Sequence, residues 1–183
     1  MTALASTLNQ SHRAQRRLSS PAGTLREQAG DPGSYQFQIV AANVADVVRS
    51  IGGLIFDRAM AGWEVSVVID GDIVIDDRPL RILGARLAER LSGSGMLRRP
   101  HLLAAATDVM VRSDAVRHQV LAMGDDEADV LLWGRHHPTN LGRTFVAVRH
   151  QPSAAARVFK SQALMAGETQ AGTGADEGFY ALT

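Results

Sequence analysis

A short polar stretch between two apolar segments concentrates side chains that can bind anions. The stretch is WGRHHPTNLGR, and its candidate residues are Arg135, His136, His137, Asn140 and Arg143. Arginine binds phosphate or carboxylate through two parallel hydrogen bonds, and histidine can donate to an anion or exchange a proton near neutral pH. Adjacent histidines on an extended chain point to opposite sides, so the pair is not expected to chelate one metal. The sequence therefore predicts an anion- or partner-binding loop, with a plain turn built on Pro138 and Asn140 as the alternative.

A second candidate is the pair Asp70 and Asp72 in the segment EVSVVIDGDIVIDD. Asp-Gly between two apolar runs favours a type I′ turn, because both residues tolerate positive φ angles, and this predicts a β-hairpin. The alternative places both carboxylates at the carboxyl end of a buried strand, where oxygen ligands suit Mg²⁺. The hairpin is favoured, so no cofactor is expected, and Mg²⁺ is the alternative.

Other familiar catalytic patterns are absent from the sequence. The junction IVAANVAD carries no G-x-G-x-x-G, and the chain has no P-loop, no G-x-S-x-G elbow and no H-E-x-x-H. It has no cysteine, which excludes disulfides, zinc–thiolate sites and cysteine nucleophiles. Asn43 is expected to cap the helix that follows, with Asp46 favourable in its first turn, and Gly52 and Gly53 indicate close packing of that helix against the sheet.

Strand-like and helix-like patterns alternate along the chain. Strands are predicted at 35–41, 64–69, 78–85, 129–134 and 144–150, and helices at 43–61, 85–91, 101–123 (as one helix or two, the second capped by Ser113) and 153–167. This alternation predicts a three-layer α/β/α sandwich with a mostly parallel sheet, with one β-hairpin if the Asp-Gly turn forms. Nearly continuous apolar strands fit a sheet covered on both faces.

The 183 residues suffice for one domain with tails. Residues 1–34 are polar, basic and rich in Ser, Gly and Pro, which predicts a disordered arm, and residues 35–166 form the predicted α/β domain. Residues 167–183 are predicted to be an acidic, Gly-rich tail, whose last residues, FYALT, either dock back or stay loose.

The formal net charge is +0, which gives no bulk argument for binding nucleic acid or membranes. Lys160 is the only lysine among many arginines, a bias typical of GC-rich, actinobacterial-like genomes. Between residues 130 and 166 the chain has basic residues and no acidic ones, so its C-terminal third is basic. No signal-peptide pattern or bilayer-spanning run is present, and a cytoplasmic protein is expected.

Two functional hypotheses follow. The favoured one is a non-catalytic binding or regulatory module that contacts an anionic small molecule, a protein partner or a second copy through its basic C-terminal third, with nucleic acid as a further alternative. The other is a small Mg²⁺-dependent enzyme for a phosphorylated or nucleotide-like substrate, with Asp70 and Asp72 on the metal and the 135–143 loop on the anion. The second requires Asp70 and that loop to lie around one pocket at the same edge of the sheet.

Overall fold

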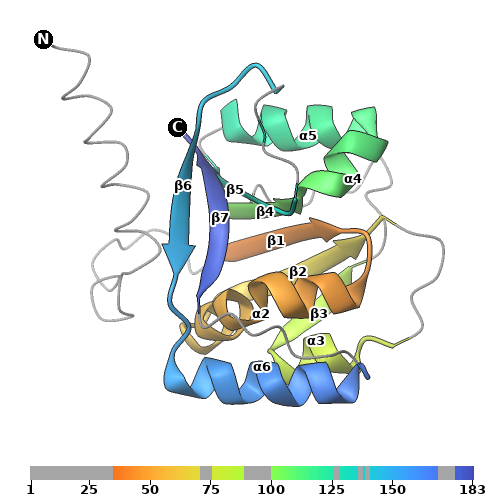
Figure 1. Cartoon of the computed structure of the whole chain (residues 1–183), viewed down its shortest axis with the longest axis vertical. Coiled ribbons are helices and arrows are strands. Elements are labelled where there is room, and N and C mark those ends of the chain that lie inside the picture. Colours follow the sequence, from red (N-terminus) through yellow and green to blue (C-terminus); the bar gives the residue numbers. More distant parts are fainter. Residues whose placement is uncertain are drawn as a thin grey trace, which may run out of the picture.

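A seven-stranded, mostly parallel sheet with helices on both faces forms the protein, as a computed structural model shows (Figure 1). The structure describes residues 35–70, 76–88, 100–125, 128–135, 138, 141–168 and 176–183. The strands are β1 (Gln36–Ala41), β2 (Glu64–Ile69), β3 (Ala85–Ala88), β4 (Leu102–Ala106), β5 (Asp129–Trp133), β6 (Phe145–His150) and β7 (Glu177–Leu182). Their order across the sheet is β3-β2-β1-β4-β5-β7-β6. The predicted α/β class is confirmed.

Strands β1 to β5 are parallel, and the central ones, β1 and β4, are buried on both faces. In β4 all five residues are buried, and in β1 every residue after Gln36 is buried. A strand covered on both sides loses the alternation of apolar and polar residues that marks a half-exposed strand. β1 lies between β2 and β4, with Ile39 opposite Val67 on one side and Ala104 on the other.

Helices cover the two faces in unequal numbers (Figure 1). α2 (Val44–Met60), α3 (Arg78–Ile82) and α6 (Ala154–Ala166) lie on one face, and α4 (Thr107–Arg112) and α5 (Asp114–Asp125) lie on the other. Asn43 caps α2 as expected, because its Oδ1 accepts a hydrogen bond of 2.8 Å from the backbone N–H of Asp46. Ser113 likewise accepts from the N–H of Val116 and caps α5.

The C-terminal strand completes the sheet. β7 pairs antiparallel with β5 on one side and with β6 on the other, so it separates two strands that precede it in the chain. Its residues Glu177, Phe179 and Ala181 are buried. Of the two alternatives for the last residues of the predicted tail 167–183, docking back is the one observed, since Glu177–Leu182 pair in the sheet as β7. Residues 1–34 lie outside the described residues.

Two elements between residues 78 and 123 differ from the sequence analysis. Arg78–Ile82 is a short helix followed by a strand, where the reverse order was predicted. The predicted helix at 101–123 begins only at Thr107, because Leu102–Ala106 forms β4. Leu-Leu-Ala-Ala-Ala is apolar without a period, so a buried strand and a buried helix look the same in sequence.

The predicted hairpin at Asp70-Gly71 is also wrong. Both edges of β2 are occupied by parallel strands over Val65–Val68, β1 on one side and β3 on the other. β2 therefore has no free edge on which an antiparallel partner could pair. Asp70 ends this strand, and residues 71–75, which include Asp72, lie outside the described residues.

The glycines of α2 make room for the C-terminal elements. A Cβ at Gly53 would lie 2.5 Å from Cγ of Pro152, and one at Gly52 would lie 3.3 Å from Cγ of Lys160. The close packing predicted for both glycines is thus present, but chiefly on α6, the segment before it and Leu83, with Glu177 of β7 as the neighbour from the sheet. Phe56 of α2 stacks on Phe159 of α6, with ring centroids 4.5 Å apart.

A buried carboxylate joins α2 to β7 and α6. Glu177 accepts hydrogen bonds from the backbone N–H groups of Gly53 and Leu54, at 2.7 and 2.9 Å, and Lys160 Nζ lies 2.6 Å from its Oε1. One turn further along α2, Asp57 contacts the ring of His150 at 3.0 Å and accepts from the N–H of Ser153. These two contacts hold the C-terminal elements on the outer side of α2.

No helix among the described residues is long and apolar enough to cross a membrane.

Candidate functional site

The strand order reverses between β1 and β4, and this reversal marks the place where α/β sheets usually bind ligands. From β1 the chain moves outward through β2 to β3, and it then returns to the other side of β1 as β4. The loops that leave the carboxyl ends of β1 and β4 therefore run to opposite faces and leave a crevice between them. Residues at the starts of α2 and α4, and at the end of β5, are the ones placed around it.

Asp46 is the carboxylate at this reversal point. It lies in the first turn of α2, partly buried, and both of its oxygens accept hydrogen bonds. The indole Nε1 of Trp133 donates to Oδ2 at 2.9 Å, and the hydroxyl of Ser50 donates to Oδ1 at 3.0 Å. The positive end of the helix dipole also favours a negative charge at this position. Each oxygen keeps a further lone pair that can accept from a substrate or a water molecule.

Trp133 brings the end of β5 into contact with α2. Its register partner on β4 is Ala106, a small buried residue, so no bulky neighbour stands between the indole and the first turn of α2. The ring is 2% exposed. Its single donor has a charged acceptor, which satisfies the polar group of a buried tryptophan.

Thr107 and Gly134 meet where β4 and β5 end. Gly134 has a φ of +130°, and a Cβ at this position would come within 2.3 Å of Oγ1 of Thr107. Only glycine fits here, since a side chain would be strained by the backbone conformation and would collide with the hydroxyl. Thr107 Oγ1 is buried and has no hydrogen-bond partner among the described residues.

The residues predicted from the sequence do not form one cluster: Asp70 and Arg135 lie at the carboxyl edge of the sheet, whereas Arg143 precedes β6, whose first residue, Phe145, is level with the start of β5 at the opposite edge. Asp70 follows β2 and Arg135 follows β5, and both strands end at the carboxyl edge because they run parallel to β1 and β4. Three strand spacings separate β2 from β5, about 14 Å at the usual spacing. Arg135 and Arg143 are exposed. His136, His137 and Asn140 lie outside the described residues.

No cluster of potential metal ligands is found in the part of the chain that the structure describes. Within the described ranges, no group of three or more His, Asp or Glu side chains is placed to hold a metal ion. Asp72, the second residue of the predicted Mg²⁺ pair, lies outside those ranges.

Sequence reasoning missed the role of Asp46 and its partner. It assigned Asp46 to the first turn of a helix and gave it no chemistry, because its indole partner lies 87 positions away in the sequence. The available signal was the position of Asp46 itself: a carboxylate in the first turn after the first strand of an α/β fold lies at the carboxyl edge.

The opposite edge of the sheet carries an aromatic cluster. The ring of Trp63 stacks on Tyr35 at 5.0 Å between centroids and lies 4.9 Å from the guanidinium carbon of Arg58. Burial lowers the pKa of Arg58, while the carboxylates of Asp129 and Asp57 oppose this shift. Because Trp63 contacts both Tyr35 and Arg58, this cluster packs side chains of the chain against one another at the amino edge.

Comparison with known proteins identifies enzymes of the same fold. The chain is similar to Dbv21, the A40926 pseudoaglycone deacetylase, with a TM-score of 0.58 and 13% identity over 82% of this chain and 98% of Dbv21. A triple mutant of a deacetylase of the teicoplanin biosynthetic pathway gives 0.55 and 15%, over 81% of this chain and 98% of the other. The deacetylase–teicoplanin complex gives 0.54 and 13% over the same shares. At these identities the likeness shows the fold.

No family model matches the sequence, and no curated protein matches it.

The comparison corrects the favoured functional hypothesis. A non-catalytic binding or regulatory module was expected because nucleotide and nucleophile motifs are absent, but the solved structures named above, which are similar to this chain in fold, are of deacetylases, and these are enzymes. The missing motifs argue only against the reactions that those motifs serve. They do not argue against hydrolysis that relies on one positioned carboxylate.

Proposed function

We propose that the protein is an enzyme that hydrolyses an acyl–amine bond, with Asp46 as its general base. Two findings support this. The fold is shared with deacetylases over about four fifths of the chain, and a partly buried carboxylate lies at the reversal point between β1 and β4, where such folds bind ligands.

The proposed reaction uses water as the nucleophile. The Asp46 carboxylate accepts a proton from the water molecule while the water oxygen forms a bond to the acyl carbon. The carbon–nitrogen bond then breaks, Asp46 returns the proton to the nitrogen of the leaving amine, and a carboxylic acid remains. General base catalysis by a positioned side chain contributes about 10²- to 10⁴-fold to the rate.

The observation that carries the proposal is the double anchoring of Asp46. Trp133 fixes one oxygen from β5, and Ser50 fixes the other from within α2. Two anchors from different elements set the orientation of the carboxylate plane, and orientation is what a base needs to meet a bound water.

The predicted anion site is retained as a proposal for substrate recognition. Arg135 follows β5 directly after Trp133 and Gly134, and so lies at the same edge as Asp46. We propose that Arg135, His136, His137, Asn140 and Arg143 contact an anionic group of the substrate. A cytoplasmic location, and Mg²⁺ at Asp70 and Asp72, likewise remain proposals.

The reaction class is tested with a panel of substrates. Purified protein is incubated with N-acetylated amino sugars, N-acetylated amino acids and longer N-acyl amines, and free amine and free acid are measured separately. We expect equal amounts of amine and acid from at least one class. A parallel panel of phosphate esters, with and without Mg²⁺, tests the alternative enzyme. Phosphate release without amine release, or no release from either panel, would contradict the proposal.

A further inference from the structure

The outer side of α6 presents apolar side chains to solvent. Figure 1 shows α6 as the outermost helix of its face, and its inner side packs on α2 and α3. Val158 is 59% exposed and Met165 is 73% exposed, and a spacing of about two helical turns brings them to the same side of the helix. Phe159, which stacks on Phe56, continues this apolar stripe on one flank and is 43% exposed. Large apolar side chains exposed together are typical of an interaction surface.

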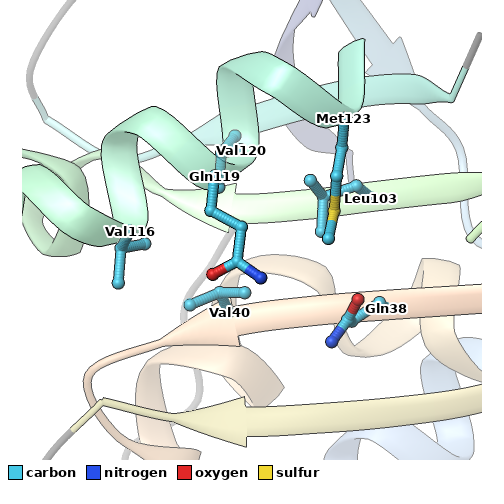
Figure 2. Close-up of a pocket in the computed structure, with 7 residues that line it drawn as sticks. All are labelled: Gln38, Val40, Leu103, Val116, Gln119, Val120 and Met123. Atoms are coloured by element: carbon cyan, nitrogen blue, oxygen red, sulfur yellow. The ribbon is translucent and has the colours of Figure 1, made fainter. Parts of the chain in front are cut away.

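The helices on the opposite face of the sheet present no comparable stripe. Figure 2 shows Val116 and Met123 of α5 directed towards the sheet, where they line a small pocket together with Val40 and Leu103. The apolar side chains of α5 are therefore used within the chain. Among the described residues of α4 and α5, Val111 is the one large apolar residue that is exposed, at 63%. It serves below as a control for the stripe on α6.

Charges of opposite sign lie at the two ends of the α6 stripe. Arg157 lies in the first turn of the helix, Glu168 follows the C-cap residue Gly167, and both are exposed. A spacing of about three helical turns brings two residues to the same flank of a helix. One guanidinium N–H of Arg157 donates to the carbonyl of Pro152 at 2.7 Å, and the guanidinium has further donors that can bind a carboxylate.

We propose that α6 is the interface of a homodimer, in which two copies of the helix pack antiparallel about a two-fold axis near Gln162. Val158 of each copy then meets Met165 of the other, and Arg157 of each copy meets Glu168 of the other. Every contact occurs twice, because the interface of a two-fold dimer is isologous. Gln162 lies midway between the two charged residues and meets its own copy, and a primary amide can both donate and accept.

The arrangement of the charges favours a second copy over a different partner. A partner surface with one sign of charge would be attracted at one end of the stripe and repelled at the other, whereas an antiparallel copy is complementary at both ends. The helix has 13 residues and is about 20 Å long, so the interface is small for a specific complex and the dimer should dissociate on dilution. This inference is independent of the proposed function.

Sedimentation equilibrium of the full chain tests the dimer. The average mass should rise from that of one chain towards that of two as the concentration is raised. Val158→Asp should keep the protein monomeric over the same range, because it buries a charge in the interface. Val111→Asp, at the equally exposed position on α4, should associate like the wild type. A wild type that stays monomeric, or equal association of the wild type and Val158→Asp, would overturn the proposal.

Charge reversal tests the antiparallel arrangement. Arg157→Glu and Glu168→Arg should each weaken dimerisation by about tenfold or more, because each turns two attractive contacts into repulsive ones. The double variant Arg157→Glu/Glu168→Arg should regain an affinity near that of the wild type, since the pairs re-form with their signs exchanged. Circular dichroism should show that each variant unfolds at the wild-type midpoint. Losses of affinity that add in the double variant would overturn the pairing and with it the proposed interface.

Discussion

At the residue scale, the account depends on the contact between Asp46 and Trp133. From the sequence, Asp46 was predicted in the first turn of a helix and Trp133 on a buried strand, but nothing linked the two residues. Their pairing requires β5 to lie two strands from β1, which no local pattern encodes. The predicted loop shows the converse: Arg135 and Arg143 are close in sequence, but one follows β5 at the carboxyl edge and the other precedes β6 at the opposite edge.

Replacement of Trp133 should destabilise the protein strongly. Trp133→Ala removes a 2% exposed indole from the core and should lower the free energy of unfolding by about 3–5 kcal/mol, measured by urea denaturation. Trp133→Phe keeps most of the ring but removes the donor to Asp46, so its loss should be smaller. A near-neutral effect of Trp133→Ala would show that the indole is not packed as described.

The two arginines of the loop should determine anion binding. Arg135→Ala/Arg143→Ala should weaken binding of heparin and mononucleotides in titrations at low salt, and added salt should weaken wild-type binding too, because charge contacts are screened. The control is Arg86→Ala/Arg149→Ala, which removes the same charge from exposed residues elsewhere. Equal affinities for wild type and the loop variant would rule out the site.

At the element scale, helix α2 contacts the sheet, carries Asp46 and packs against the C-terminal elements. One side packs on the sheet, the first turn carries Asp46, and Gly52, Gly53, Phe56 and Asp57 face the C-terminal elements. The sequence predicted α2 and its cap well, because apolar spacing and Asn43 are local signals. It misplaced β4 and α3, since short apolar runs carry no period. It left the docking of β7 open, because the partners of Glu177 are more than 120 positions away.

The buried ion pair between Lys160 of α6 and Glu177 of β7 should contribute strongly to the free energy of unfolding. Lys160→Met leaves a carboxylate that is 2% exposed without its cation, and removal of one partner from a buried pair costs about 3–5 kcal/mol. The measurement is the free energy of unfolding in urea. Arg86→Met breaks the exposed pair with Glu64 and should cost no more than about 1 kcal/mol. Similar small losses in both variants would contradict the structural role of Glu177.

At the scale of the whole molecule, the two ends of the chain should behave differently. β1 begins at Gln36, so the described sheet is complete without residues 1–30, and a variant that lacks them should unfold at an unchanged midpoint. A variant ending at residue 175 loses β7, exposes the facing edges of β5 and β6, and should not fold cooperatively. Circular dichroism during thermal unfolding distinguishes the two. A large loss on removing the first segment, or a cooperative fold without β7, would contradict this organisation.

The fold is similar to that of two deacetylases over about four fifths of the chain, and its reversal point carries a carboxylate that is anchored through both oxygens, so the central proposal is that Asp46 takes part in the chemistry. The most direct test is kcat/KM for amine release by wild type and by Asp46→Asn, with the best substrate from the panel. Asparagine keeps the shape but cannot accept the proton, and we predict a fall of about 10²-fold or more. Asp114→Asn, a first-turn aspartate of α5 whose side chain is 78% exposed, should retain wild-type activity. An Asp46→Asn enzyme as active as the wild type would contradict the account.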